Sequence, residues 1–211
     1  AVYLAIGLSG ACALGAEVIW TRQLSLMLGA TVYTFSIILA VFLMGLGSSA
    51  GAFLMRGSIH PGVALGWCQW LAAIGIAWTA SMLSSQLPYW PVSPSSAPTP
   101  WVTFQFGLMR CFWAILPAPC LWGASFPLAL AAVGPDTGDQ GRLVGGVYAA
   151  KTIGAIAGAL GFSVCMVAWL GTQAAQQVLI GMSAVAALVV WGPLLWRIGL
   201  KGYERGDPAE S

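Results

Sequence analysis

The strongest constraint on this chain is a succession of six long apolar segments that carry almost no charge. An α-helix needs about 20 mostly apolar residues to cross the hydrocarbon core of a bilayer, and each segment is near or above that length. Only 7% of the residues are charged, whereas a soluble domain carries about 25%. We therefore predict an all-α integral membrane protein. Its expected spans are residues 2–22, 31–55, 62–84, 102–132, 143–169 and 174–196.

The lysine and arginine residues predict how these spans are oriented. Cytoplasmic loops of membrane proteins carry an excess of both residue types. With both termini in the cytoplasm, Arg22 alone falls on the outer side. We therefore expect a membrane domain over 1–196 and a cytoplasmic tail over 197–211, in a bacterial inner membrane. The inner positive charges are then Arg56, Arg142, Arg197, Lys201 and Arg205.

The fourth expected span contains three prolines, Pro117, Pro119 and Pro127. Proline lacks the backbone N–H, and its ring clashes with the carbonyl four residues earlier in a helix. Sharp helix kinks occur most often at this residue type. We therefore expect this span to be kinked or broken.

The two halves of the membrane domain resemble each other in sequence. Residues 12–16 (CALGA) match 120–124 (CLWGA) at an offset of 108, and residues 47–52 (GSSAGA) match 154–159 (GAIAGA) at an offset of 107. A unit of three spans reverses direction, so the second unit must enter the membrane from the opposite face. The pattern predicts an inverted 3+3 repeat, as in each half of a major facilitator transporter. Repeat A would cover 1–84 and repeat B 102–196.

Four glycines in these repeats are candidates for close helix packing. Gly47 and Gly51 share one helix face, as do Gly154 and Gly158, because residues four apart are neighbours on a helix. Small residues let two helix backbones approach in a bilayer. Packing is the first interpretation, and a substrate path along the same surface is the alternative.

Several ordered motifs resemble a known family. They lie at residues 9–10 (SG) with 16–24 (AEVIWTRQL), 42–48 (FLMGLGS), 122–128 (WGASFPL) and 141–155 (GRLVGGVYAAKTIGA). They resemble the membrane region of spermidine-synthase-like proteins, a major-facilitator-type membrane region fused to a spermidine synthase domain. The resemblance covers most of the chain and implies the half-facilitator fold.

Two departures limit what this resemblance implies. Within this chain no GxGxxG motif follows a strand and no acidic pair could bind an amine, so we do not expect transferase activity. Lys151 also stands where the family motif has asparagine. A titratable cation therefore replaces a neutral amide within the fifth expected span.

Ionisable residues within the expected spans are the candidate functional residues, because an unpaired charge in hydrocarbon is costly. They are Glu17, Arg110 and Lys151. At about 1.5 Å per residue, Glu17 and Arg110 reach comparable depths, and we expect them to form an ion pair between spans one and four. Arg22 is a competing partner, although a spacing of five does not align two side chains on one helix.

The role of Lys151 stays open at this point, because no acidic residue is expected at its depth. The amine could be neutral, extend toward the interface, contact carbonyls freed near Pro117 and Pro119, or meet an acid of a partner protein. Tyr148 and Thr152 flank Lys151 one helical turn away or less. They would either line a polar pocket or pack against neighbouring helices.

No cofactor or metal is expected. His60, the single histidine, falls in a short loop, whereas haem ligation usually needs a histidine within a span. The five cysteines form no CxxC pair and lie in apolar stretches, as is typical of packing residues. No basic run could follow a phosphate backbone, so we expect no nucleic-acid partner.

Three functions fit these features. The first is a non-catalytic accessory or structural subunit that packs with other membrane subunits or with copies of itself. The second is a transporter or small-molecule binder, which would need a second six-span unit. The third is a membrane anchor for an aminopropyltransferase. The small number of acidic residues within the spans counts against direct transport of polyamines.

Overall fold

The computed structural model describes residues 1–29, 31–47, 60–89, 99–133 and 140–205. These residues form helices and no β-strand, as the all-α prediction requires. The main helices are α1 (Val2–Leu28), α2 (Val32–Gly47), α4 (Pro61–Ser81), α5 (Pro100–Ile115), α6 (Pro117–Val133), α7 (Gln140–Leu160) and α8 (Val167–Arg205). The short segments η1 (Met82–Gln86) and η2 (Leu87–Tyr89) extend α4, and η3 (Gly161–Met166) joins α7 to α8.

Two helices begin with the same combination of a capping side chain and a proline. The Gly62 N–H donates to His60 Nδ1 at 3.3 Å just before α4, and the Val102 N–H donates to Thr99 Oγ1 at 3.4 Å before α5. Each helix then starts at a proline. Proline suits this position because its missing N–H would have no partner in the first turn.

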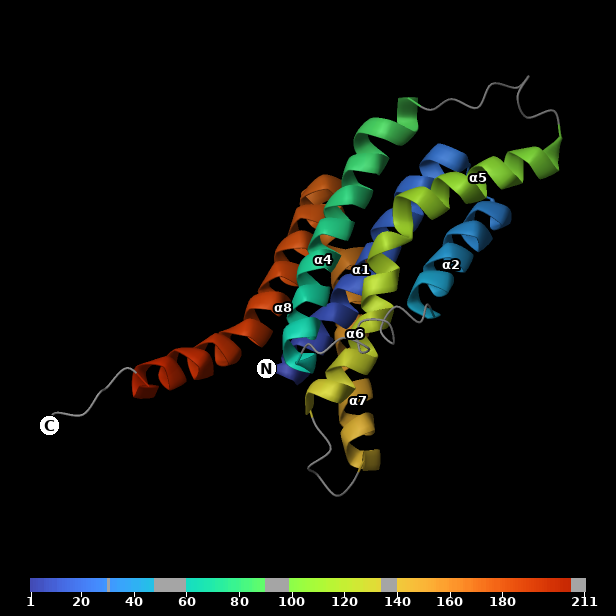
Figure 1. The fold of residues 1–211 in the computed structure, drawn as a ribbon. Coiled ribbons are helices and arrows are strands. Elements are labelled where there is room, and N and C mark those ends of the chain that lie inside the picture. Colours follow the sequence, from blue (N-terminus) through green and yellow to red (C-terminus); the bar gives the residue numbers. More distant parts are fainter. Residues whose placement is uncertain (30, 48–59, 90–98, 134–139, 206–211) are drawn as a thin grey trace, which may run out of the picture.

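The fourth expected span is broken, as its prolines predict. It consists of α5 and α6, which meet at Leu116 and are bent by 55° relative to each other. Pro117 begins α6, and Pro127 lies within it. The bend directs α5 away from the bundle axis, as the yellow-green helices of Figure 1 show.

A glycine separates the fifth and sixth expected spans. Gly171 has a φ of 76° and a ψ of 172°, so the helix that follows it is a new one. This left-handed region of φ is accessible to glycine at little cost. The break falls between the expected boundaries at 169 and 174.

The helices run in alternating directions through the bundle (Figure 1). At one end Ala1, Ala132 and Pro193 line a common pocket with the start of α4. At the other end Leu28 of α1 and Trp101 of α5 line a common groove with the start of α2. Among the described residues, α1 and the pair α5 and α6 therefore each run from one of these ends to the other.

Three described helical stretches are long and apolar enough to cross a membrane, or four when the bent pair α5 and α6 counts as one span. One stretch, Gln140–Pro193, includes α7 and the first part of α8 and is divided at Gly171. The described part of α2 is shorter, at 16 residues. The end of the second expected span, 48–55, lies outside the described residues.

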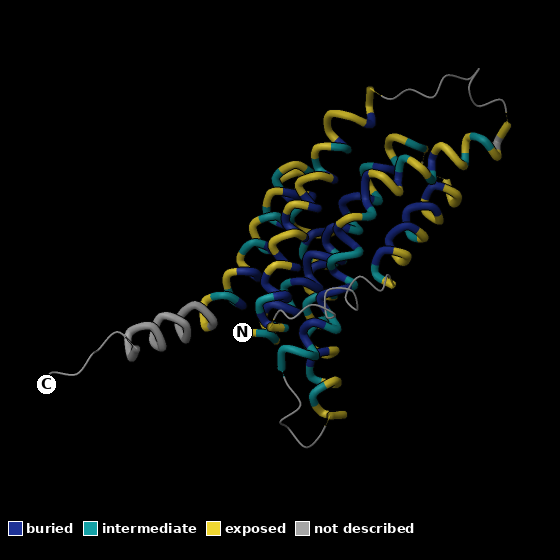
Figure 2. The backbone as a smooth tube through the Cα atoms, viewed as in Figure 1, coloured by how far each residue is buried: buried dark blue, intermediate teal, exposed yellow. Residues whose placement is uncertain are grey.

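The packing is organised in helix pairs. The most extensive contacts join α1 to α7, α4 to α8, α4 to α6, α1 to α8 and α2 to α6. Figure 2 shows buried residues on the inward faces and exposed residues on the outward faces. Many large apolar side chains are exposed on the outward faces, for example Trp169, Leu26 and Trp101.

Glycines allow the closest of these approaches. A Cβ at Gly154 or Gly158 would collide with the backbone of α1 at Gly7 or Ala11, so α1 and α7 touch backbone to backbone. Gly47 differs from the expectation, because a Cβ there would meet no atom of the described residues within 4 Å.

Other glycines make the corresponding contact between α2 and α6. A Cβ at Gly123 would collide with the Leu46 carbonyl, and one at Gly45 would collide with Pro119. The contact between α2 and α6 therefore involves Gly45 and not Gly47, because Gly45 is the glycine that faces α6. Gly51 lies outside the described residues.

Candidate functional site

The side chain of Lys151 makes two contacts with α6. Its Nζ donates to the Trp122 carbonyl oxygen at 2.9 Å and lies 5.7 Å from the centre of the Phe126 ring. The carbonyl and the ring face are both regions of negative potential and attract a cation. The structure therefore gives Lys151 a carbonyl partner, which was one of the open interpretations. The acceptor belongs to Trp122, however, and not to the residues beside Pro117 and Pro119.

The same carbonyl anchors a short polar chain across three helices. Ser125 Oγ donates to the Trp122 oxygen at 2.6 Å, and Ser125 Oγ lies 3.1 Å from Ser9 Oγ of α1. Both serines are buried. The chain from Ser9 through Ser125 and the carbonyl to Lys151 thus links α1, α6 and α7 inside an apolar bundle. Sequence inspection missed the two serines as site residues, although Ser9 lies in the segment 9–10 and Ser125 in the segment 122–128 that the sequence analysis singled out.

Lys151 also borders an open groove along α7. The groove measures about 550 Å³ and is lined by Tyr148, Lys151 and Thr152 together with Leu14 of α1 and apolar side chains of α7. Tyr148 packs edge-on against Phe126, with 6.4 Å between ring centres. The predicted neighbours Tyr148 and Thr152 therefore do line one surface with Lys151, and this surface is predominantly apolar.

A second shallow groove holds Glu17 and Arg22. It measures about 480 Å³ and lies between α1 and the Phe35 side chain of α2. Leu14 contributes to both this groove and the groove along α7. Within the described residues, neither Glu17 nor Arg22 makes an ion pair or a side-chain hydrogen bond.

The expected ion pair between Glu17 and Arg110 is not formed among the residues that the structure describes. Arg110 lies on α5, whose main contacts are with α2. The depth argument assumed a straight fourth span. The 55° bend between α5 and α6 moves Arg110 away from α1, so equal depth does not bring the two charges together.

The centre of the bundle is filled by aromatic rings. Trp20 and Trp122 stack with 5.7 Å between ring centres, and Phe42 lies 6.0 Å from Trp122. All three side chains are buried. Tryptophan is common at the two membrane interfaces, but Trp20 and Trp122 are instead part of the buried core between α1, α2 and α6.

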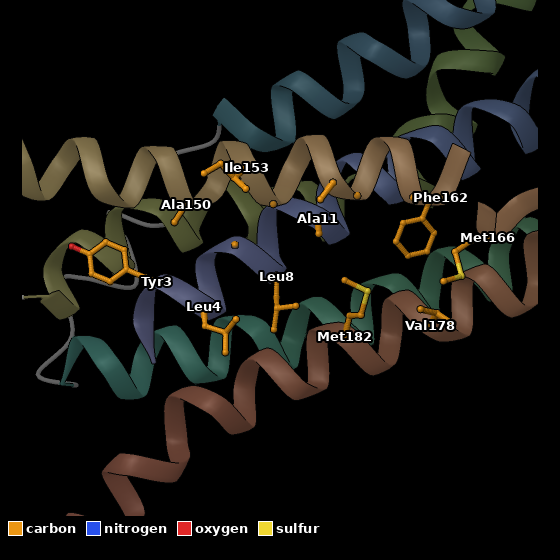
Figure 3. A pocket seen from close by; sticks show the side chains of 15 residues that line it. Tyr3, Leu4, Leu8, Ala11, Ala150, Ile153, Phe162, Met166, Val178 and Met182 are labelled. Atoms are coloured by element: carbon orange, nitrogen blue, oxygen red, sulfur yellow. The ribbon is translucent and has the colours of Figure 1, made fainter. Parts of the chain in front are cut away.

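A further apolar groove lies between α1, α7 and α8 (Figure 3). It measures about 460 Å³, and its labelled walls include Leu4 and Leu8 of α1, Ile153 of α7 and Met182 of α8. Tyr3 lies at one end and Phe162 toward the other (Figure 3). Its lining carries no charged side chain, so the groove suits hydrocarbon.

The remaining candidates have structural positions. His60 caps α4. Cys12, Cys68 and Cys111 are buried free thiols, whereas Cys165 is exposed. Across the described segments, no group of three histidine, cysteine or acidic side chains gathers as a set of metal ligands.

A double-mutant cycle tests the shared carbonyl. Lys151→Met and Ser125→Ala each remove one of the two side-chain donors to the Trp122 oxygen, so each is expected to cost about 1 kcal/mol of unfolding free energy. The double variant leaves this oxygen without a side-chain donor, and we expect its loss to differ from the sum of the single losses by at least about 0.5 kcal/mol, because the two donors share one acceptor. Reversible unfolding in mixed micelles measures the three losses, and strict additivity would contradict the shared-acceptor geometry.

No family model, curated protein or solved structure matches this chain. The geometry above is therefore the basis for the functional proposal.

Proposed function

We propose that this chain is a non-catalytic multi-pass membrane protein that serves as an accessory or structural subunit of a larger membrane complex. The observation that carries the proposal is the pair of charges, Glu17 and Arg22, that have no partner among the described residues and lie in a groove at the surface of a predominantly apolar bundle. Glu17 lies within the first expected span, where a charge that faces lipid hydrocarbon is costly, and Arg22 lies at the outer end of that span. Cover by another protein removes this cost and explains why the charges are there.

The interior supports a packing role. Trp20, Trp122 and Phe42 fill the centre, and Lys151 is engaged by a backbone carbonyl and an aromatic ring. These side chains stabilise the bundle and leave little polar surface for a ligand.

Six membrane spans in an inverted 3+3 repeat are part of this proposal. In such a repeat, spans one, two and three (α1, α2 and α4) correspond in order to spans four, five and six (α5 with α6, α7, and α8). The contact between α1 and α7 then converts into the contact between α6 and α2, and the contact between α1 and α8 converts into the contact between α6 and α4. The α4–α8 contact converts into itself. All of these are among the most extensive contacts of the bundle, as an inverted repeat like that of half a major facilitator transporter requires.

We further propose a bacterial inner membrane with both ends of the membrane domain cytoplasmic. Ala1 and Pro193 line one pocket, so the start of α1 and this part of α8 are at the same end of the bundle. The lysine and arginine distribution then favours that end as the cytoplasmic one.

Isolation in a mild detergent tests the subunit proposal. We expect the chain to co-purify with other membrane polypeptides at fixed stoichiometry, identified by mass spectrometry, or as an oligomer of itself. Isolation as a monomer with no stoichiometric partner, from membranes where it is naturally present, would refute the proposal.

A transporter or small-molecule binder is the second candidate. The proline-bent α5 and α6, together with the groove lined by Lys151 and Tyr148, favour it, because broken helices are common at transport sites. Solute uptake by the purified chain in liposomes would support this reading over the first. The resemblance to spermidine-synthase-like proteins adds a third candidate, an anchor for an aminopropyltransferase, which co-purification with such an enzyme would support.

A further inference from the structure

The shallow groove on α1 has the pattern of a helix-packing surface. Its α1 residues are Leu14, Glu17, Val18, Thr21, Arg22 and Ser25. Leu14, Val18, Thr21 and Ser25 are spaced by four, three and four residues. This is the spacing of the a and d positions of a heptad, which places side chains along the seam between two helices that cross at a small angle.

The two charges occupy the positions that flank such a seam. With Leu14 and Thr21 at d and with Val18 at a, Glu17 falls at g and Arg22 at the following e. In heptad-packed helices, e and g side chains form ion pairs between helices and set their relative orientation. A spacing of five from g to the following e fits a pair between two parallel helices, although it does not suit a pair within one helix.

We propose that α1 packs in parallel against α1 of a second copy of this chain, with Glu17 of each copy paired with Arg22 of the other. The inference rests on the proposed subunit role and names the partner at this groove. Copies inserted in the same orientation have parallel α1 helices, and a two-fold axis along the membrane normal relates them. Such an axis makes an isologous contact, in which every pair occurs twice.

The charge balance favours a second copy as the occupant. One acid and one base lie unpartnered in the same groove, so two copies neutralise all four charges without any other group. An acyl chain would cover the apolar residues but leave the charge of Glu17, which lies within the expected span, in hydrocarbon. Thr21 and Ser25 are small enough to let two helices approach.

Cysteine crosslinking tests the proposed seam without changing a charge. In a Cys165→Ser background, which removes the exposed native thiol, Thr21→Cys is expected to form a disulfide-linked dimer upon mild oxidation in membranes. Leu26→Cys is the matched control, since Leu26 is 81% exposed on the same helix but lies outside the heptad seam. We expect several-fold more dimer from Thr21→Cys. Equal dimer yields from the two variants would overturn the proposal. So would the absence of a dimer of Thr21→Cys, or a crosslink from Thr21→Cys to another protein.

Charge reversal tests the ion pairs. Glu17→Arg places two bases in the seam, and Arg22→Glu places two acids there, so each variant alone is expected to lose the dimer. Co-expressed with different tags, the two variants are expected to form a mixed dimer, because every contact again joins opposite charges. Size-exclusion chromatography of each single variant establishes that it is folded and monomeric.

Neutral variants serve as a second test in case either charge-reversed chain aggregates. Glu17→Gln and Arg22→Gln are each expected to reduce the yield of the Thr21→Cys crosslink.

The outcomes separate this inference from the proposed function. A chain that co-purifies with other subunits but gives no Thr21→Cys dimer overturns the α1 pairing and leaves the subunit role in place. A crosslinked dimer that also takes up solute in liposomes supports the pairing and refutes the accessory role.

Discussion

Replacing Trp122 with alanine is expected to give the largest loss of stability of any single aromatic truncation in this chain. Trp122 is fully buried and contacts Trp20 and Phe42 through its ring. Truncation leaves a cavity at the junction of α1, α2 and α6, and such changes cost about 3–5 kcal/mol. The reactivity of the buried thiols Cys12 and Cys111 on heating in detergent reports unfolding, because both belong to the same buried cluster.

Trp169→Ala is the matched control for this truncation. Trp169 is 88% exposed on the outer face, and the same change of side chain there is expected to shift stability by no more than about 0.5 kcal/mol. A loss at Trp169 equal to that at Trp122 would show that the aromatic cluster is not the core of the bundle.

Gly154→Val is expected to separate α1 from α7. A Cβ at Gly154 would collide with the Gly7 carbonyl, so the two backbones must move apart at their most extensive contact. Overpacking of this kind typically costs about 1–3 kcal/mol, and the backbone on both sides leaves little room for relaxation. Unfolding in detergent measures the loss, and a shift in disulfide trapping between α1 and α7 would report the separation.

Gly145→Val on the same helix provides the control. A Cβ at Gly145 would meet nothing within 4 Å, and valine is a better helix former than glycine. We expect unchanged or slightly higher stability. Comparable losses at the two positions would indicate that helix propensity, and not backbone contact, governs the effect.

Local signals in the sequence predicted much of the architecture. The apolar segments and low charge predicted helices of membrane-spanning character, and the prolines predicted the broken fourth segment. The similarity between residues 47–52 and 154–159 highlighted Gly154 and Gly158, and both of these glycines face α1. Each of these features depends on the chain within a few residues, so composition and spacing are sufficient to predict it.

The tertiary structure decided which residues meet. Depth along straight helices suggested an ion pair between Glu17 and Arg110, but the bend at Leu116 directs α5 elsewhere. Residue spacing alone did not show that Trp122 would be the shared partner of Lys151, Ser125 and Trp20. Nor did it favour Gly45 over Gly47 for packing. The sequence by itself determined the helical, lipid-compatible character of the chain, because periodicity and apolar length are local properties. The contacts of its charged and aromatic side chains required the fold, because helix bend and rotation depend on packing between distant segments.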